Sequence, residues 1–170
     1  MSAVAIIPAR GGSRRIPRKN IREFHGKPII AYSIITARNC GLFDAVCVST
    51  DDDEIAAIAI GHGAMILERS KWLADDYVGT QQVMQDALSV FSAQHMDQHY
   101  DHACCIYATC PMLTVEDLHD GYRALKKRVA RYAFSVGADP LRDAGMFYWG
   151  TAKQLRVLSM RPFSSRLSIR

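Results

Sequence analysis

Residues 3–20 read AVAIIPARGGSRRIPRKN, a short apolar run followed at once by a basic loop with two adjacent glycines. An apolar run of this length, bounded by turn residues, is typical of a strand that is buried on both faces of a parallel sheet. The loop after such a strand leaves the sheet at its carboxyl edge, where open α/β folds bind their ligands. The opening of the chain therefore predicts an α/β fold with a ligand site in the loop 10–20.

Short apolar runs alternate with longer segments of helical period along most of the chain. They predict strands at residues 4–7, 45–49, 64–67, 102–107 and 132–136. They predict helices near residues 29–38, 53–60, 81–93 and 115–128. This alternation favours a Rossmann-like sandwich, in which a mostly parallel sheet has helices on both faces.

The pattern weakens after residue 136. Residues 137–140 (GADP) indicate a turn, residues 146–149 (MFYW) a short strand and residues 152–157 a helix. With 170 residues, of which 49% are hydrophobic, the chain can bury one ordinary core. We therefore expect a single domain, in which residues 1–136 form the core and residues 137–170 a shortened, atypical C-terminal segment.

Charge and cysteine content narrow the classes of function. The formal net charge is only +4, and much of the basic excess lies at residues 10–22 and after Lys153, which favours a phosphorylated small ligand over a nucleic acid. The amino terminus has no basic segment followed by a long apolar run, so we expect a cytoplasmic protein that does not enter a membrane. The cysteines have no C-x-x-C spacing and are expected to be reduced, mostly buried thiols: Cys40, Cys47, Cys104, Cys105 and Cys110.

The basic loop has the parts of a triphosphate cradle. Gly11 and Gly12 let the backbone approach an anion closely and turn its N–H groups toward it. Arg10 offers phosphoryl oxygens a planar fork, and Lys19 offers them a point charge. The loop has neither the G-K-[ST] of a P-loop nor the third glycine of G-x-G-x-x-G, so it is a third kind of phosphate loop. The alternative is that it is a solvated basic turn.

Three segments at the start of the chain carry a specific resemblance. Residues 7–13 (IPARGGS), 16–21 (IPRKNI) and 26–31 (GKPIIA) closely resemble the opening of the acylneuraminate cytidylyltransferases, or CMP-sialic acid synthetases, and in particular of their pseudaminic acid branch. The resemblance continues in order through most of residues 3–136, with a further match at residues 143–150. It implies the nucleotide-diphospho-sugar transferase fold and a transferase that couples CTP to an acidic nine-carbon sugar for cell-surface glycans, giving a CMP-sugar and pyrophosphate.

The resemblance also implies roles for individual residues. Arg10 and Lys19 act as the catalytic cations on the triphosphate. The other residues implied to bind the nucleotide are Gly11, Gly12, Ser13, Asn20, Arg69, Asp76 and Thr80. Arg69 is expected near the cytosine. The expected reaction is in-line attack of the anomeric hydroxyl on the α-phosphorus, with Mg²⁺ bridging phosphate oxygens.

The sugar is expected at the carboxyl end of the fourth strand, which carries Tyr107 and Thr109. The commoner sialic acid synthetases have a glutamine where Tyr107 stands, so the resemblance implies a different acid. Tyr148, on the short aromatic strand, either lines the same site or belongs to the core.

The acidic residues of the sequence form no clear metal-binding pattern. Residues 51–54 (DDDE) follow a strand and start a helix, where capping of the helix is favoured over a metal site. The family carries a D-x-D stretch near its end and an arm that exchanges between subunits, whereas here no acidic residue follows Asp143 and six residues, 137–142, stand in place of the arm. The sequence therefore identifies no metal ligands. We expect a homodimer whose contacts are weakened by the missing arm. Two alternatives are a CTP-binding protein without turnover and a nucleic-acid-binding protein.

Overall fold

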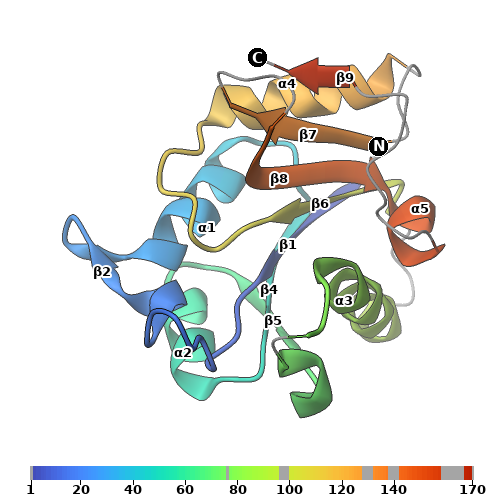
Figure 1. The fold of residues 1–170 in the computed structure, drawn as a ribbon. Helices are drawn as coiled ribbons and strands as arrows, with labels where there is room; N and C mark the ends of the chain where they lie inside the picture. Colours follow the sequence, from blue (N-terminus) through green and yellow to red (C-terminus); the bar gives the residue numbers. More distant parts are fainter. Residues whose placement is uncertain are drawn as a thin grey trace.

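The computed structural model describes residues 2–75, 77–95, 100–127, 132–137, 142–157 and 167–169. Within these residues the strands form a seven-stranded sheet in the order β5-β4-β1-β6-β8-β7-β9 and a separate hairpin, β2-β3 (Figure 1). The strands of the large sheet are β1 (Ala3–Pro8), β4 (Ala45–Thr50), β5 (Met65–Glu68), β6 (His102–Ile106), β7 (Tyr132–Val136), β8 (Asp143–Thr151) and β9 (Leu167–Ile169). The hairpin strands are β2 (Glu23–Phe24) and β3 (Lys27–Pro28).

Strand direction divides the sheet into two parts. The strands β5, β4, β1 and β6 run parallel, as does the outer pair β7 and β9. Strand β8 lies between β6 and β7 and is antiparallel to both. The predicted mostly parallel sheet is therefore confirmed, with β8 as the strand that reverses direction.

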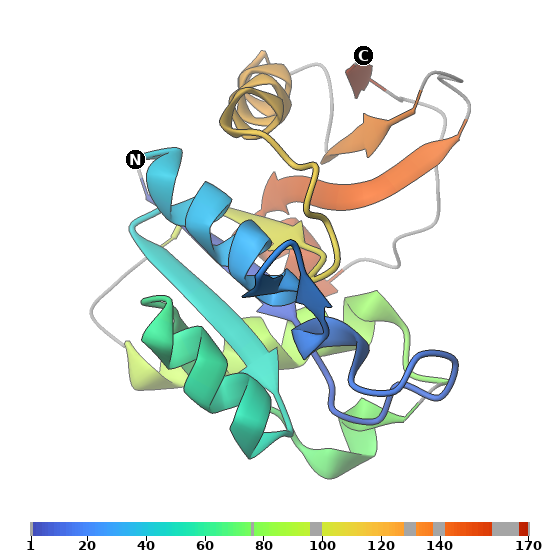
Figure 2. The ribbon, with the colours of Figure 1, turned by 90° about the vertical axis from the view of Figure 1, so that its left-hand side faces the viewer.

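Helices cover both faces of the sheet (Figures 1 and 2). The helices are α1 (Ile29–Asn39), α2 (Asp53–Gly61), α3 (Thr80–Gln94), α4 (Val115–Lys126) and α5 (Ala152–Val157), with short 3₁₀ helices η1 (Lys19–Ile21) and η2 (Lys71–Ala74). Buried side chains of α1, α2 and α4 belong to one core cluster, and those of α3 and α5 belong to the other. The Rossmann-like sandwich is confirmed.

The alternation of side chains along β1 shows how the strand serves both cores. Ala5 and Ile7 pack in the cluster under α1, α2 and α4, whereas Val4 and Ile6 pack in the cluster under α3 and α5. All four are fully buried. A strand with helices on both faces needs apolar residues at every position, which is why β1 is a continuous apolar run.

The elements predicted before residue 137 agree with the structure to within two residues at each described end. Strand β8 is longer than the expected strand at 146–149, and α5 matches the expected helix at 152–157. Most of the expected turn at 137–140 lies outside the described residues. The boundary expected at residue 136 falls between β7 and β8, which are hydrogen-bonded neighbours in the same sheet.

Two further expectations from composition can be compared with the structure. The five cysteines of the chain are all buried and form no disulfide, as expected. Among the described residues, no helix combines the length and the apolar character that crossing a membrane requires.

Candidate functional site

A pocket of about 200 Å³ lies at the carboxyl edge of the parallel strands. The loop after β1, the segment after β5, the start of α3 and the end of β6 meet there, because the carboxyl ends of parallel strands share one edge. Eight of the predicted site residues line it: Arg10, Ser13, Lys19, Asn20, Arg69, Thr80, Tyr107 and Thr109. The structure thus brings together residues that lie up to a hundred positions apart in the sequence.

Backbone contacts hold the loop after β1 against the end of β4. The N–H of Ala9 donates to the carbonyl of Ser49 at 2.9 Å, which extends the β1–β4 ladder by one residue. The N–H of Gly11 donates to Oδ1 of Asp51 at 3.2 Å. A Cβ at Gly11 would lie 2.3 Å from a carboxylate oxygen of Asp52, so a larger residue there would displace the Asp52 side chain. Neither Gly11 nor Gly12 lines the pocket.

Arg10 and Lys19 bring two positive charges to the pocket from opposite ends of the loop. Nη1 of Arg10 donates to the carbonyl of Ala74 at 3.1 Å, which joins the loop to η2. Asn20, which is 6% exposed, donates from Nδ2 to the carbonyl of Arg10 at 3.0 Å. This bond holds the two ends of the loop together, so Asn20 shapes the cradle as well as lining it.

Arg69 is a buried cation on the pocket wall, only 4% exposed. Its Nη2 donates to the carbonyl of Ser49 at 2.7 Å and its Nε to Oγ of Ser49 at 3.2 Å. Burial lowers the pKa of Arg69 from its ordinary value, while the charges of Asp51 and Asp86 oppose this shift. The guanidinium is therefore fixed in position before any ligand arrives.

Tyr107 forms the end of the pocket nearest to β8. Its hydroxyl lies 2.8 Å from Oγ1 of Thr80, so the two side chains are hydrogen-bonded across the pocket wall. Burial raises the pKa of Tyr107, which keeps its hydroxyl neutral. The ring of Tyr148 packs edge-on against it, with 5.9 Å between centroids, and the Tyr148 hydroxyl donates to Asp143. Tyr148 thus supports Tyr107 from behind and does not line the pocket.

Some apolar pocket residues were not assigned a role from the sequence. Leu73, Val78 and Val83 add an apolar part to the wall. The carboxylate of Asp75, in the segment that carries the family resemblance, also lines the pocket. The signal for the apolar three is weak, because isolated aliphatic residues in a loop and a helix suggest core packing. The predicted site residue Asp76 lies outside the described residues.

Comparison with known proteins identifies the family. Residues 4–148 match the family model described as Cytidylyltransferase. The chain belongs to this family. It is 40% identical over 167 residues to a pseudaminic acid cytidylyltransferase from Campylobacter jejuni, a match that covers 98% of this chain and 71% of that protein. It is 37% identical over 119 residues to a CMP-N,N'-diacetyllegionaminic acid synthase from Legionella pneumophila, covering 69% of this chain and 50% of that protein.

Solved structures show the same fold. A CMP:2-keto-3-deoxy-manno-octonic acid synthetase complexed with CTP superposes with a TM-score of 0.72 at 18% identity, covering 94% of this chain and 80% of that one. At this level of identity the likeness concerns the fold of the cytidylyltransferase. The side chains of the pocket must be interpreted from this chain itself.

Two acidic residues of the cytidylyltransferase, Asp52 and Asp75, have different roles in the structure. The side chain of Asp52 accepts from the N–H of Ile55 at 3.0 Å and caps α2, which confirms the capping interpretation of residues 51–54. Asp75 is the only carboxylate among the pocket-lining residues that the structure describes. No group of three or more His, Cys, Asp or Glu side chains among the described residues could hold a metal by itself.

Oxygen donors in the pocket nevertheless suit magnesium. Mg²⁺ usually takes one or two protein carboxylates and completes its shell with water and substrate phosphates. The carboxylate of Asp75 and the hydroxyls of Ser13, Thr80 and Thr109 are such donors. The residues present therefore fit a magnesium ion that is held mainly by a triphosphate.

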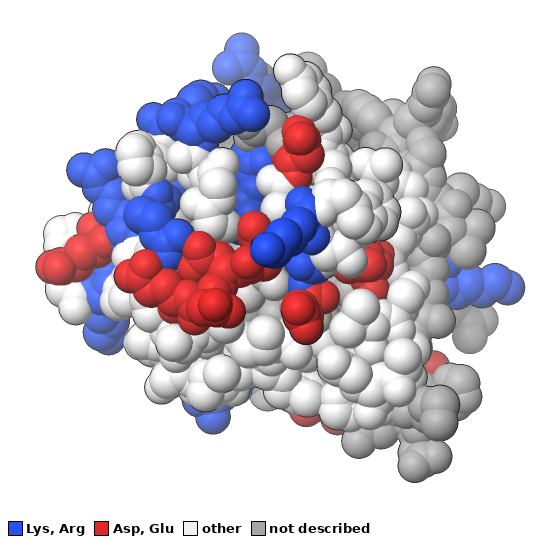
Figure 3. Space-filling view, turned by 90° about the horizontal axis from the view of Figure 1, so that it is seen from below, with Lys and Arg blue, Asp and Glu red and all other residues white. Residues whose placement is uncertain are grey.

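Basic and acidic side chains adjoin each other on one end of the cytidylyltransferase. Figure 3 shows Lys and Arg side chains beside Asp and Glu side chains on the end seen from below. This surface is not uniformly positive. A mixed surface favours a local, shaped anion site over attraction of a long polyanion.

Proposed function

We propose that this cytidylyltransferase transfers a cytidylyl group from CTP to a nonulosonic acid, with pseudaminic acid as the preferred acid, and releases pyrophosphate. The observation that carries the proposal is the pocket itself, where Arg10, Lys19 and Arg69 surround a space of about 200 Å³ that Tyr107 bounds. The 40% identity to a pseudaminic acid cytidylyltransferase across 98% of the chain supports the choice of acid.

Catalysis in this proposal depends on position and charge. The triphosphate lies against Arg10, Ser13 and Lys19, and the two cations offset the charge that develops on the departing pyrophosphate. The anomeric hydroxyl of the sugar attacks the α-phosphorus in line with the leaving oxygen. Magnesium, when bound beside Asp75, supplies further neutralisation of the phosphate oxygens.

A covalent intermediate on a protein thiol is unnecessary and is disfavoured by the chemistry of the cysteines. Burial raises the pKa of Cys105 to about 12 and that of Cys110 to about 11. Neither thiol ionises near neutral pH, and a neutral thiol is a poor nucleophile. Direct transfer from CTP to the sugar is the simpler reaction for this site.

The sugar in this proposal occupies the end of the pocket near Tyr107 and Thr109. Because the Tyr107 hydroxyl is already bonded to Thr80, it presents mainly its ring to a ligand. An aromatic ring packs well against the C–H face or the acyl methyl groups of a sugar. Tyr148 contributes indirectly, by holding that ring.

The test is to incubate the purified chain with CTP, Mg²⁺ and either pseudaminate or N-acetylneuraminate and to measure pyrophosphate. We expect faster release with pseudaminate. Binding of CTP with no pyrophosphate from either acid would replace the proposal with the alternative of a CTP-binding protein without turnover. Salt-dependent binding to random DNA at physiological ionic strength would favour the nucleic-acid alternative.

Arg10→Ala and Lys19→Ala separate phosphate binding from base binding in the same assay. Each variant should weaken CTP binding about tenfold or more, because each removes a charge-assisted contact to phosphate. Cytidine, which has no phosphate, should lose little affinity. Equal losses for CTP and cytidine in isothermal titration calorimetry would contradict the placement of the triphosphate.

A further inference from the structure

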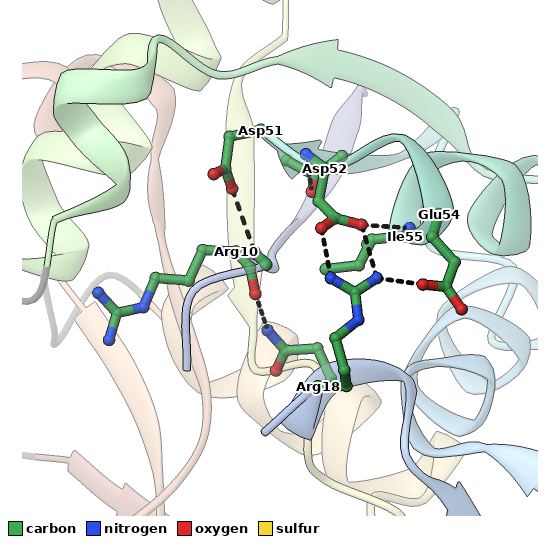
Figure 4. Close-up of polar contacts among 9 residues, drawn as sticks. Arg10, Arg18, Asp51, Asp52, Glu54 and Ile55 are labelled. Atoms are coloured by element: carbon green, nitrogen blue, oxygen red, sulfur yellow. Dashed lines mark hydrogen bonds and ion pairs between the residues drawn. The ribbon is translucent and has the colours of Figure 1, made fainter. Parts of the chain in front are cut away.

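Arg18 is a loop cation that does not face the pocket. Arg10 and Lys19 of the same loop line the pocket, and Arg18 does not. Its guanidinium turns instead toward the start of α2, whereas the side chain of Arg10 extends away from that cluster (Figure 4). The positive charge of Arg18 therefore has a different use from that of its neighbours.

The guanidinium of Arg18 donates hydrogen bonds to two carboxylates. Its Nη1 donates to Oδ2 of Asp52 at 2.5 Å and its Nη2 to Oδ1 of Asp52 at 2.9 Å, and Nη2 also donates to Oε2 of Glu54 at 2.5 Å. The fork-to-fork geometry with Asp52 is the most specific form of arginine–carboxylate pairing. We call this cluster of Arg18, Asp52 and Glu54 the clasp.

Asp52 gives the clasp a fixed base. Its carboxylate also caps α2 by accepting from the N–H of Ile55 at 3.0 Å. The hydrogen bonds from Arg18 lower the pKa of Asp52 to about 2, so the acid is ionised at every physiological pH. The side chain of Asp52 is only 18% exposed, which limits screening by salt. Through Asp52, the loop that carries Arg18 is therefore anchored to the start of α2.

The backbone at Arg18 needs support of this kind. Arg18 has φ 53° and ψ 31°, in the left-handed region that non-glycine residues seldom adopt. Its carbonyl accepts from the N–H of Ile21 at 3.0 Å, so η1 begins directly after it. Lys19 and Asn20, the next two residues, line the pocket. The conformation of Arg18 therefore decides in which direction these two side chains leave the loop.

The turn between β4 and α2 holds the loop at two points. Asp51 accepts from the N–H of Gly11 near the beginning of the loop, and Asp52 accepts from the side chain of Arg18 near its end. Two adjacent acidic residues thus act as a template for the phosphate-binding loop. The charge of Arg18 also offsets carboxylates that would otherwise repel a bound triphosphate.

We propose that Arg18 is a positioning residue, whose clasp on Asp52 and Glu54 sets the backbone of residues 18–20 so that Lys19 and Asn20 face the nucleotide. Arg18 is not a ligand of the triphosphate. The functional part of this inference rests on the proposed function, since CTP is the probe.

The experiment compares Arg18→Ala, Asp52→Ser and the double variant. Serine at position 52 still caps the helix but is too short to reach Arg18. Arg123→Ala is the matched control, since Arg123 likewise pairs with two carboxylates, Glu116 and Asp120, on the surface of α4. Each variant is assayed for CTP affinity by calorimetry, for kcat and KM, and for hydrogen exchange of residues 11–20.

The clasp predicts similar losses of CTP affinity when either Arg18 or Asp52 is replaced. Arg18→Ala and Asp52→Ser should each weaken CTP binding about tenfold, and the double variant should lose no more than Arg18→Ala, because Arg18→Ala already removes the pair that Asp52→Ser breaks. Arg18→Lys keeps the charge without the fork and should lose less than Arg18→Ala. Amides of residues 11–20 should exchange faster in both single variants, without CTP, and Arg123→Ala should match the wild type.

A triphosphate ligand at position 18 would give a different pattern. Asp52→Ser would then free the arginine and leave CTP binding unchanged or tighter, while Arg18→Ala alone weakened it. Unchanged exchange of residues 11–20 in Arg18→Ala would also overturn the clasp. Hydrogen exchange needs no nucleotide, so it tests the clasp even if the wild-type chain fails to bind CTP and the proposed function itself is wrong.

Discussion

Individual cations of the site differ in how firmly the fold holds them. Arg10 and Lys19 extend from a loop, whereas Arg69 is buried and makes two hydrogen bonds to Ser49. A cation that is already fixed loses little entropy when a ligand binds, so it can discriminate between ligands. Arg69 is therefore the residue at which a conservative change should have the greatest effect.

Arg69→Lys should weaken CTP binding by about tenfold to a hundredfold, because lysine retains the charge but has no planar fork for Ser49 and the ligand. It should also lower the melting temperature, since Ser49 loses its buried hydrogen bonds to the guanidinium. Calorimetry and thermal unfolding measure the two effects. Arg38→Lys is the control, because Arg38 makes an exposed contact to the carbonyl of His62. Wild-type affinity in Arg69→Lys would remove Arg69 from the nucleotide site.

Tyr107 is expected to influence the choice of sugar. Replacing it with glutamine removes the aromatic wall and the hydrogen bond to Thr80. Tyr107→Gln should lower the ratio of kcat/KM for pseudaminate over N-acetylneuraminate by about tenfold, the scale at which one pocket contact discriminates. The KM for CTP should change little. An unchanged ratio between the two acids would place the sugar elsewhere.

Elements meet at the site through their ends. The loop after β1, the turn before α2 and the start of α3 contribute short segments to one pocket or to its support. Local capping decides how these ends are built, as with Asp52 at α2 and the Thr114–Asp117 capping box at α4. Because Asp52 both caps α2 and pairs with Arg18, it connects the stability of that helix to the shape of the site.

The ion pair at the start of α2 gives a pH-dependent prediction. The pKa of Asp52 is lowered in the folded chain to about 2, against about 3.9 for aspartate in an unfolded chain. Its contribution to the free energy of unfolding is therefore complete above about pH 5 and is lost as the pH falls through about 4 to 2. Asp52→Asn retains the cap but lacks this titration. The stability gap between wild type and variant, measured by urea unfolding, should narrow as the pH falls below about 4 and close near about pH 2; a constant gap would exclude the pair as its source.

At the scale of the whole molecule, strand β8 joins the parallel strands β5, β4, β1 and β6 to the outer pair β7 and β9. It follows residue 136 in the sequence, yet it lies between β6 and β7 in the sheet and pairs with both. Trp149, on this strand, is fully buried and stacks against Phe43 with 4.9 Å between centroids. The residues after 136 thus help to form the core on which the pocket is built.

Gly121 lies where α4 packs closely on β8. A Cβ at this position would lie 2.6 Å from the ring of Phe147 and 2.7 Å from that of Trp149. Gly121→Ala should therefore lower the free energy of unfolding by about 1–3 kcal/mol, as overpacking does, with CTP affinity unchanged. Gly61→Ala is the control, because nothing lies within 4 Å of its Cβ. Denaturant unfolding of the two variants makes the comparison, and equal stabilities would show that α4 can shift without cost.

Periodicity explains why so much of the fold was predictable. The apolar run of β1 and the helical spacing of α1 to α4 are properties of neighbouring residues, and their structure follows from local preference and burial. The loop cations Arg10 and Lys19 were recognisable as candidates because a basic, glycine-containing loop after a buried strand is suited to binding an anion. The apolar residues of the pocket wall carry no such local signal.

The sequence by itself determined the α/β class and the positions of most elements, and it led to the proposed anion-binding role of residues 10–20, because each depends on residues that are close along the chain. Only the tertiary structure decided that β8 lies between β6 and β7, that Tyr148 stands behind Tyr107, and that Arg18 turns away from the pocket. The pair between Arg18 and Asp52 joins residues 34 positions apart. Such contacts depend on how the elements pack, and a list of charges along a loop does not reveal which of them will meet a carboxylate and which will face a ligand.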